Sequence, residues 1–220
     1  MMPNSKRFFS ADSFWNTPIG SDPVVDERSD HLIKLLRDAL EKKGRNGFWI
    51  NYDYWTIPVY EANQATPLRR VAQRVVRPGE IYLPRTGFRH GPGFGPEIPV
   101  PDAAQPAREA DGHLAIVDRE RGIGWDMWAA RWREDGQLES FTGMTYRLDG
   151  SSVFDPALFP ARDGESLHCY GPSRHAGVPA IAGLAMYDEI RSGRIEHKLS
   201  FASCVVLATG CRGQFEGVMG

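Results

Sequence analysis

Residues 113–148 constrain the fold most strongly, because three strand-like segments follow one another with only short connections between them. The segments read HLAIVD, IGWDMWAARW and LESFTGMTYRL, and they are joined by RERG and EDGQ. Apolar and polar side chains alternate along them, which is the period of a β-strand, and the second connection contains the Asp135-Gly136 pair that favours a tight hairpin. The pattern predicts a β-meander of three antiparallel strands.

The rest of the chain also favours strands and turns, since it supplies most of the 23 glycines and 16 prolines. One amphipathic helix is predicted over 26–44, a short helix lies within AMYDEIRSG near the C-terminus, and the Gly/Pro-rich stretch 84–106 predicts a long ordered loop. We therefore expect a single domain over 1–220, a mainly β, jelly-roll-like sandwich of two antiparallel sheets with the first helix covering its core. An eight-stranded barrel is the alternative.

The short RERG connection also predicts a register for the first hairpin. If Asp118 pairs with Ile123, the alternation separates two faces of the sheet. The first face is apolar and is predicted to pack in the core; it consists of Leu114, Ile116, Trp125, Met127 and Ala129. The second face consists of His113, Ala115, Asp126, Trp128 and Ala130. A titratable pair beside an indole indicates a ligand-binding sheet surface.

This second face favours acid–base chemistry on a sugar. An imidazole titrates near neutral pH, so His113 and Asp126 are the candidate acid and base, and Trp128 is a candidate platform for a sugar ring. A glycoside hydrolase would need a second carboxylate near Asp126. A polysaccharide lyase would need a base and a residue such as Arg131 or Asn16 to neutralise a uronate carboxylate. Hydrolysis is slightly favoured, and the structural alternative is a buried His–Asp hydrogen bond that only orders the sheet.

Further candidate substrate-binding residues lie elsewhere in the chain. Trp15 and Tyr52 provide aromatic rings, and His90 lies in the Gly-rich loop. His175 lies in a polar loop, and His197 follows the C-terminal helix. The histidines and cysteines lack the spacing of a zinc site, so we expect neither a metal ion nor a cofactor.

Three segments, FSADSFWN, DGHLAIVDRERGIGWDMWAARW and AGVPAIAGLAMYDEIRSGRIEHKLSF, together resemble a largely uncharacterised bacterial family of concanavalin-A-like β-sandwich proteins. The resemblance spans most of the chain. The positions that it covers are Ser13, Phe14, Trp15, Asn16, Asp111, His113, Asp126, Trp128, Arg131 and His197. It implies a jelly-roll fold and, by analogy with many proteins of that fold, binding or cleavage of polysaccharides. At the position of Asp126 the family more often has a glutamate.

Composition limits the classes of partner that this protein is expected to bind. The net charge of -2, from 26 basic and 28 acidic residues, does not favour a nucleic-acid partner. No apolar run approaches the about 18 residues of a membrane span, so we expect no membrane partner. The N-terminus lacks the apolar segment of a secretory signal, which favours the cytoplasm unless a signal has been removed. We expect a carbohydrate-active enzyme with an open groove on one sheet, and the alternatives are a non-catalytic glycan-binding module or a phage-type assembly protein. The sequence leaves the oligomeric state open.

Overall fold

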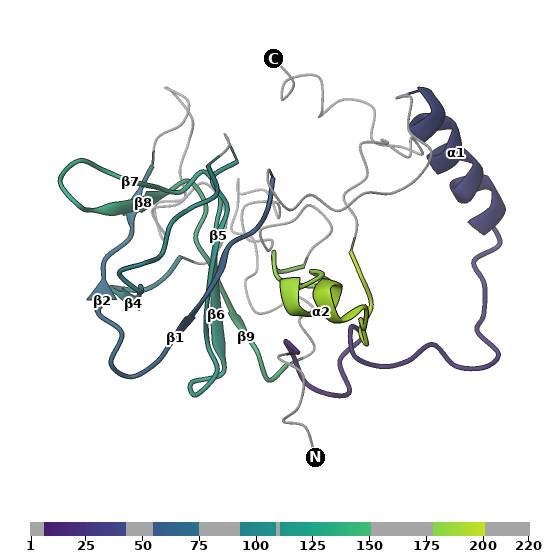
Figure 1. Cartoon of the computed structure of the whole chain (residues 1–220), viewed down its shortest axis with the longest axis horizontal. Helices are drawn as coiled ribbons and strands as arrows, with labels where there is room; N and C mark the ends of the chain where they lie inside the picture. Colours follow the sequence, from purple (N-terminus) through teal and green to yellow (C-terminus); the bar gives the residue numbers. More distant parts are fainter. Residues whose placement is uncertain (1–6, 43–54, 75–92, 109–110, 151–177, 201–220) are drawn as a thin grey trace, which may run out of the picture. The chain divides into compact units, whose positions relative to one another are not determined.

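The computed structural model describes residues 7–42, 55–74, 93–108, 111–150 and 178–200. These residues form the helices α1 (Ser29–Lys42) and α2 (Tyr187–Ser192) and the strands β1 (Val59–Ala62), β2 (Leu68–Arg69), β3 (Ala72–Gln73), β4 (Ile98–Pro99), β5 (Leu114–Asp118), β6 (Ile123–Met127), β7 (Arg131–Trp132), β8 (Leu138–Ser140) and β9 (Met144–Arg147) (Figure 1). Contacts divide the chain into two compact units, one of Met1–Thr17 and Asn51–Ser200, the other of Pro18–Ile50 and Phe201–Gly220. All of these strands and α2 belong to the first unit.

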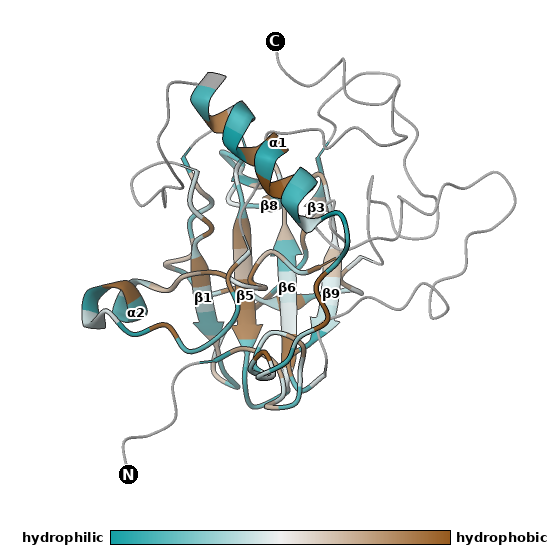
Figure 2. Cartoon of the chain, turned by 90° about the vertical axis from the view of Figure 1, so that its right-hand side faces the viewer, coloured by the Kyte–Doolittle hydropathy of each residue, from teal (hydrophilic) through white to brown (hydrophobic). Residues whose placement is uncertain are grey.

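The described strands form three sheets. The largest has the order β1-β5-β6-β9, which Figure 2 shows side by side, and the smaller ones are β2-β4 and β3-β8-β7. The mainly β prediction is confirmed. The two-sheet antiparallel jelly roll is not confirmed, because β1 pairs parallel to β5 and β3 pairs parallel to β8. Parallel pairing needs a long connection, and about fifty residues separate β1 from β5.

The predicted register of the first hairpin is confirmed, since Asp118 pairs with Ile123 and Ala115 pairs with Asp126. The structure differs from the predicted meander in one respect, because the second and third predicted strands are each divided between two sheets. β6 and β9 pair in the large sheet, whereas β7 and β8 pair in a small one. Ala129 lies at the break after β6 with φ 52°, a left-handed conformation that residues with a Cβ seldom adopt. This backbone conformation turns the chain from one sheet into the next.

One hydrophobic core joins all three sheets. Burying apolar side chains contributes about 25 cal/mol per Å², so this core is a main source of stability. Its buried members include Val71, Phe94, Ile98, Val100, Leu114, Ile116, Trp125, Met127 and Leu138. The core face predicted for the first hairpin is therefore confirmed for its strand residues. Packing is also confirmed for the part of the loop 84–106 that is described, although β4 gives this part a short strand.

The opposite face of β5 is buried as well. Ala115 and Val117 lie in a second core together with Phe8, Leu148 and Ile181. The segments that carry Phe8 and Ile181 therefore cover the face that the sequence predicted to be open. The expectation of an exposed groove along this part of β5 is wrong, because two segments distant in sequence from the meander pack on it.

The helices agree with the predicted positions. α1 lies within the predicted range 26–44, but it belongs to the second unit, so its covering role stays a prediction. α2 ends at Gly193, whose φ of 67° gives the left-handed C-cap that glycine favours. Residues 195–200 carry no strand where the long final strand was predicted to begin. Neither α1 nor α2 is long and apolar enough to cross a membrane.

Candidate functional site

Asp111, His113 and Trp128 form a polar cluster where β5 begins and β6 ends. The indole Nε1 of Trp128 donates a hydrogen bond of 3.2 Å to Asp111 Oδ1, and His113 Nε2 lies 3.9 Å from Asp111 Oδ2. The side chains of Asp111 and His113 are 41% and 18% exposed. The cluster therefore brings an imidazole and a carboxylate together where solvent, and hence a ligand, reaches both.

The backbone holds this cluster in place through two short hydrogen bonds. The amide of Ala129 donates to the Asp111 carbonyl at 2.7 Å, and the amide of Ala130 donates to the Gly112 carbonyl at 2.9 Å. Gly112 has φ 47°, and a Cβ there would lie 2.8 Å from the Ala130 carbonyl oxygen. Only glycine permits this close approach, so the sequence DGH places Asp111 and His113 against the end of β6.

Trp128 also contacts the residues between β8 and β9 and the last residue of β8. Its amide donates to Thr142 Oγ1 at 2.9 Å, and its carbonyl accepts from Ser140 Oγ at 3.2 Å. The indole meets the Phe141 ring edge-on, with centroids 5.4 Å apart. These contacts give the indole a fixed orientation, which a stacking or hydrogen-bonding role requires.

Arg131 continues the site onto the small sheet. It lies opposite Glu139 in the β7–β8 pair, and its Nε donates to Glu139 Oε1 at 2.5 Å. Arg74 Nε lies 3.8 Å from the same oxygen, and Arg74 Nη1 donates to the carbonyl of Ala129 at 2.7 Å. Burial, and then the charge of Arg131, lower the pKa of Arg74. Two guanidinium groups therefore share one carboxylate beside the strained residue that follows Trp128.

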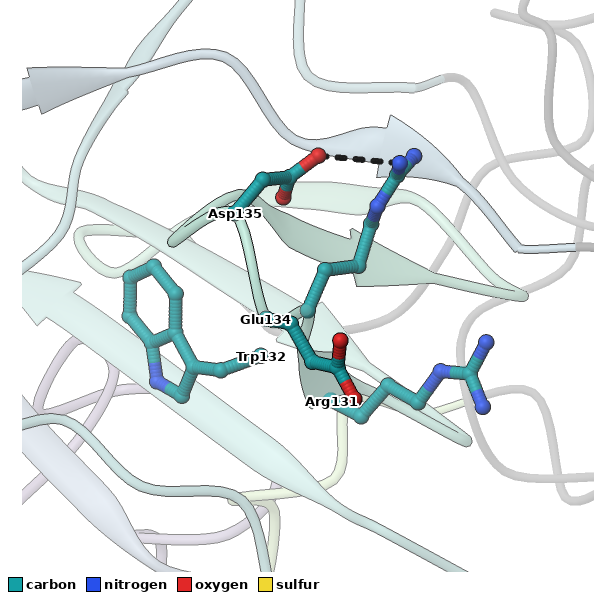
Figure 3. Close-up of a pocket in the computed structure, with 5 residues that line it drawn as sticks. Arg131, Trp132, Glu134 and Asp135 are labelled. Atoms are coloured by element: carbon teal, nitrogen blue, oxygen red, sulfur yellow. Dashed lines mark ion pairs between the residues drawn. The ribbon is translucent and has the colours of Figure 1, made fainter.

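An open hollow of about 560 Å³ lies beside Arg131, and its described lining runs from Arg131 to Asp135 (Figure 3). Trp132 is half-buried in this lining, and its Nε1 donates to the carbonyl of Ala104 at 2.8 Å. Trp132 was not among the site residues predicted from the sequence. Its place in the strand next to the Asp135-Gly136 turn was the signal that could have identified it.

Asp126, the predicted acid–base partner of His113, is wholly buried. Its Oδ1 accepts a hydrogen bond of 2.7 Å from the Tyr146 hydroxyl, and its Oδ2 accepts one from the amide of Ala180. Burial, with the Asp126 charge next in size, raises the pKa of Tyr146 well above its ordinary value. The prediction that Asp126 lies on an open face is wrong, because its carboxylate binds the segment around Ala180 to the sheet.

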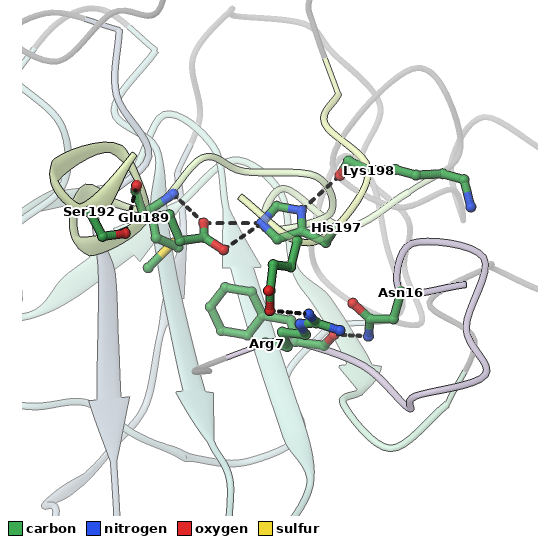
Figure 4. A network of polar contacts seen from close by, with 9 residues as sticks. Arg7, Asn16, Glu189, Ser192, His197 and Lys198 are labelled. Atoms are coloured by element: carbon green, nitrogen blue, oxygen red, sulfur yellow. Dashed lines mark hydrogen bonds and ion pairs between the residues drawn. The ribbon is translucent and has the colours of Figure 1, made fainter. Parts of the chain in front are cut away.

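His197 lies in a polar network near α2 rather than on an open surface (Figure 4). Its Nε2 lies 3.0 Å from Glu189 Oε2, and its Nδ1 lies 2.8 Å from the Lys198 carbonyl. The side chain is 10% exposed. Glu189 also accepts from the amide of Met186, which caps the first turn of α2. His197 thus anchors the first turn of α2 to the segment that follows the helix.

Trp15 and Asn16 are buried in the N-terminal segment. Asn16 Nδ2 donates to the carbonyls of Phe8 and Ser10 at 2.8 and 2.9 Å, and the Trp15 carbonyl accepts from the amide of Lys198 at 2.9 Å. These contacts close the N-terminal segment into a turn and join it to the chain after α2. Neither side chain presents the open surface that a sugar-binding role predicts.

Tyr52, His90 and His175 lie outside the described residues. Within the described ranges, no group of three or more His, Cys, Asp and Glu side chains could hold a metal ion. No protein-family model, no curated protein and no solved structure matches the chain.

Proposed function

We propose that this protein is a carbohydrate-active enzyme that cleaves a polysaccharide, with His113 as the acid–base group. The observation that carries the proposal is the cluster of His113, Asp111 and Trp128, a partly exposed imidazole beside a carboxylate and an oriented indole. Asp111 takes the position beside His113 that sequence analysis had given to Asp126. A carboxylate next to an imidazole orients the ring and stabilises its protonated form during proton transfer.

The two cleavage reactions make different demands on this cluster. Hydrolysis by two carboxylates needs a pair about 5 Å apart for retention and a wider separation for inversion. Asp126 is wholly buried, which disfavours it as one of the two carboxylates. Elimination needs one base and a cation near a uronate carboxylate, and His113 and Arg131 are of the required types. The slight preference for hydrolysis therefore no longer holds for the residues that the structure describes.

A concanavalin-A-like relationship remains part of the proposal, and it rests on the three sequence segments that resemble that family. The parallel pairs β1–β5 and β3–β8 depart from the antiparallel sheets that it implies. A non-catalytic glycan-binding module is the second candidate function, because the fixed indole of Trp128 would serve it equally well.

The test is incubation of the whole chain with neutral and uronate polysaccharides, reading reducing ends and the ultraviolet absorbance of an unsaturated uronate in the same samples. The His113→Ala variant is the control, and its turnover should fall by at least about hundredfold because a general acid–base group contributes that much. Binding of a polysaccharide without release of any product, by wild type and variant alike, would favour the glycan-binding module and contradict the enzyme.

A further inference from the structure

We propose that the outer face of the small sheet β3-β8-β7 binds the carboxylate of a uronate-containing polysaccharide, and that Arg131 holds this carboxylate. The inference rests on the proposed function for its location beside the catalytic cluster, and it adds the chemical class of the substrate.

The pairing register places these side chains on one face. Arg131 and Ala72 both pair with Glu139, one from each side of β8, and Arg74 follows Ala72 by two residues. The next residue along β8, Leu138, points into the hydrophobic core. Since side chains alternate along a strand, Arg131, Glu139 and Arg74 lie on the face away from this core.

The Arg131 guanidinium has room for a second acceptor. It is 59% exposed and, among the described residues, it bonds to Glu139 through Nε. Its two terminal amino groups then present the fork that accepts a planar carboxylate in two parallel hydrogen bonds. Figure 3 shows this guanidinium projecting away from Asp135, which pairs with Arg133 instead.

The charges on this face also favour an anion. Arg74 and Arg131 approach the same oxygen of Glu139, so two positive charges share one negative charge. A second carboxylate beside Arg131 would balance the remaining positive charge. A uronate has such a group on every residue of the polymer, whereas a neutral sugar has none.

The position of the face relative to the catalytic cluster is fixed by the backbone. Arg74 donates to the carbonyl of Ala129, and the amide of Ala129 donates to the backbone carbonyl of Asp111. A hollow of about 560 Å³ that is open to solvent lies beside Arg131. A chain that lies in this hollow would present a carboxylate to Arg131.

The experiment measures binding of polygalacturonate and of its fully methyl-esterified form, which has the same backbone without the negative charge. Wild type should bind the charged polymer at least about tenfold more tightly, and Arg131→Gln should lose about tenfold, as expected for one bidentate charge-assisted contact. Arg131→Lys keeps the charge but not the fork, so its affinity should lie between those of wild type and Arg131→Gln.

Arg147→Gln is the matched control, because Arg147 is 63% exposed and pairs with one carboxylate, Asp149, on another sheet. Its affinity for polygalacturonate should equal that of wild type. Dextran sulfate and dextran form a further pair of probes. Equal binding of both polygalacturonate forms, equal loss in the Arg131 and Arg147 variants, or preference for dextran sulfate over polygalacturonate would each overturn the uronate assignment.

The cleavage assay separates this inference from the proposed function. Charge-dependent binding without any cleavage would support the uronate site and contradict the enzyme. Cleavage confined to neutral polysaccharides would support the enzyme and contradict the uronate site.

Discussion

Asp111 and Asp126 are carboxylates near the same end of one hairpin, where β5 begins and β6 ends, and they have opposite environments. Asp126 is wholly buried and accepts hydrogen bonds from Tyr146 and from the amide of Ala180. Asp111 is 41% exposed, accepts a hydrogen bond from the indole of Trp128 and lies 3.9 Å from the imidazole of His113. A buried carboxylate bound by two donors stabilises the fold, whereas a partly exposed carboxylate beside a histidine is placed for chemistry. The following predictions test this division.

The largest expected effect is that of Asp126→Ala. It leaves the Tyr146 hydroxyl and the Ala180 amide without their acceptor, so the free energy of unfolding should fall by about 3 kcal/mol. Urea denaturation of the whole chain measures the loss. Asp149→Ala is the control, because that carboxylate is exposed, and its midpoint should hardly move. A stable Asp126→Ala protein would contradict the structural role.

Gly124→Ala tests the same buried group indirectly. Gly124 pairs with Tyr146 across β6 and β9, and a Cβ at position 124 would overlap the Tyr146 ring. The ring would have to move away from Asp126, so we expect a loss of about 2 kcal/mol in thermal or urea unfolding. Gly20→Ala, where a Cβ meets nothing within 4 Å, should change little. Equal stability of the two variants would show that the Tyr146 position is not critical.

His197→Gln should have the smallest effect. The imidazole bridges Glu189 and the Lys198 carbonyl, and losing its contact with the carboxylate should cost about 1 kcal/mol of stability. Polysaccharide turnover should be unchanged under conditions in which the variant is folded. Arg194→Gln, which removes an exposed partner of Glu196, serves as the control. A His197 variant that keeps its stability but binds polysaccharide more weakly would restore the substrate-binding role predicted from the sequence.

Local pattern was sufficient to predict the hairpin. Four residues of RERG fixed the pairing of Asp118 with Ile123, and the apolar alternation identified Leu114 and Met127 as core. The division of the longer strands was not predictable in the same way. The predicted faces put Ala129 in the core and Ala130 opposite, but the left-handed conformation of Ala129 interrupts the alternation, and Ala130 is the next core residue after Met127. A sequence pattern shows which side chains share a face, but the segments that cover that face come from elsewhere in the chain.

The candidate site was therefore predicted in part. Three of the predicted side chains, His113, Trp128 and Arg131, are partly or largely exposed. Ala129 lies between them, because its amide donates to the Asp111 carbonyl and its carbonyl accepts from Arg74. Asp126 was assigned to an open face because nothing in its own strand indicates that Phe8 and Ile181 cover the neighbouring residues. Arg74 was not selected at all, since its link to Arg131 exists only through the parallel pairing of β3 with β8.

The most direct test compares Asp111→Asn with Asp126→Asn, measuring both urea unfolding and product release from polygalacturonate. The account predicts that Asp111→Asn keeps its stability and loses at least about tenfold in turnover, because the amide no longer stabilises a protonated His113. It predicts that Asp126→Asn is less stable but turns over normally while it is folded. A folded Asp126→Asn protein without activity, beside an Asp111→Asn protein with full activity, would contradict the account.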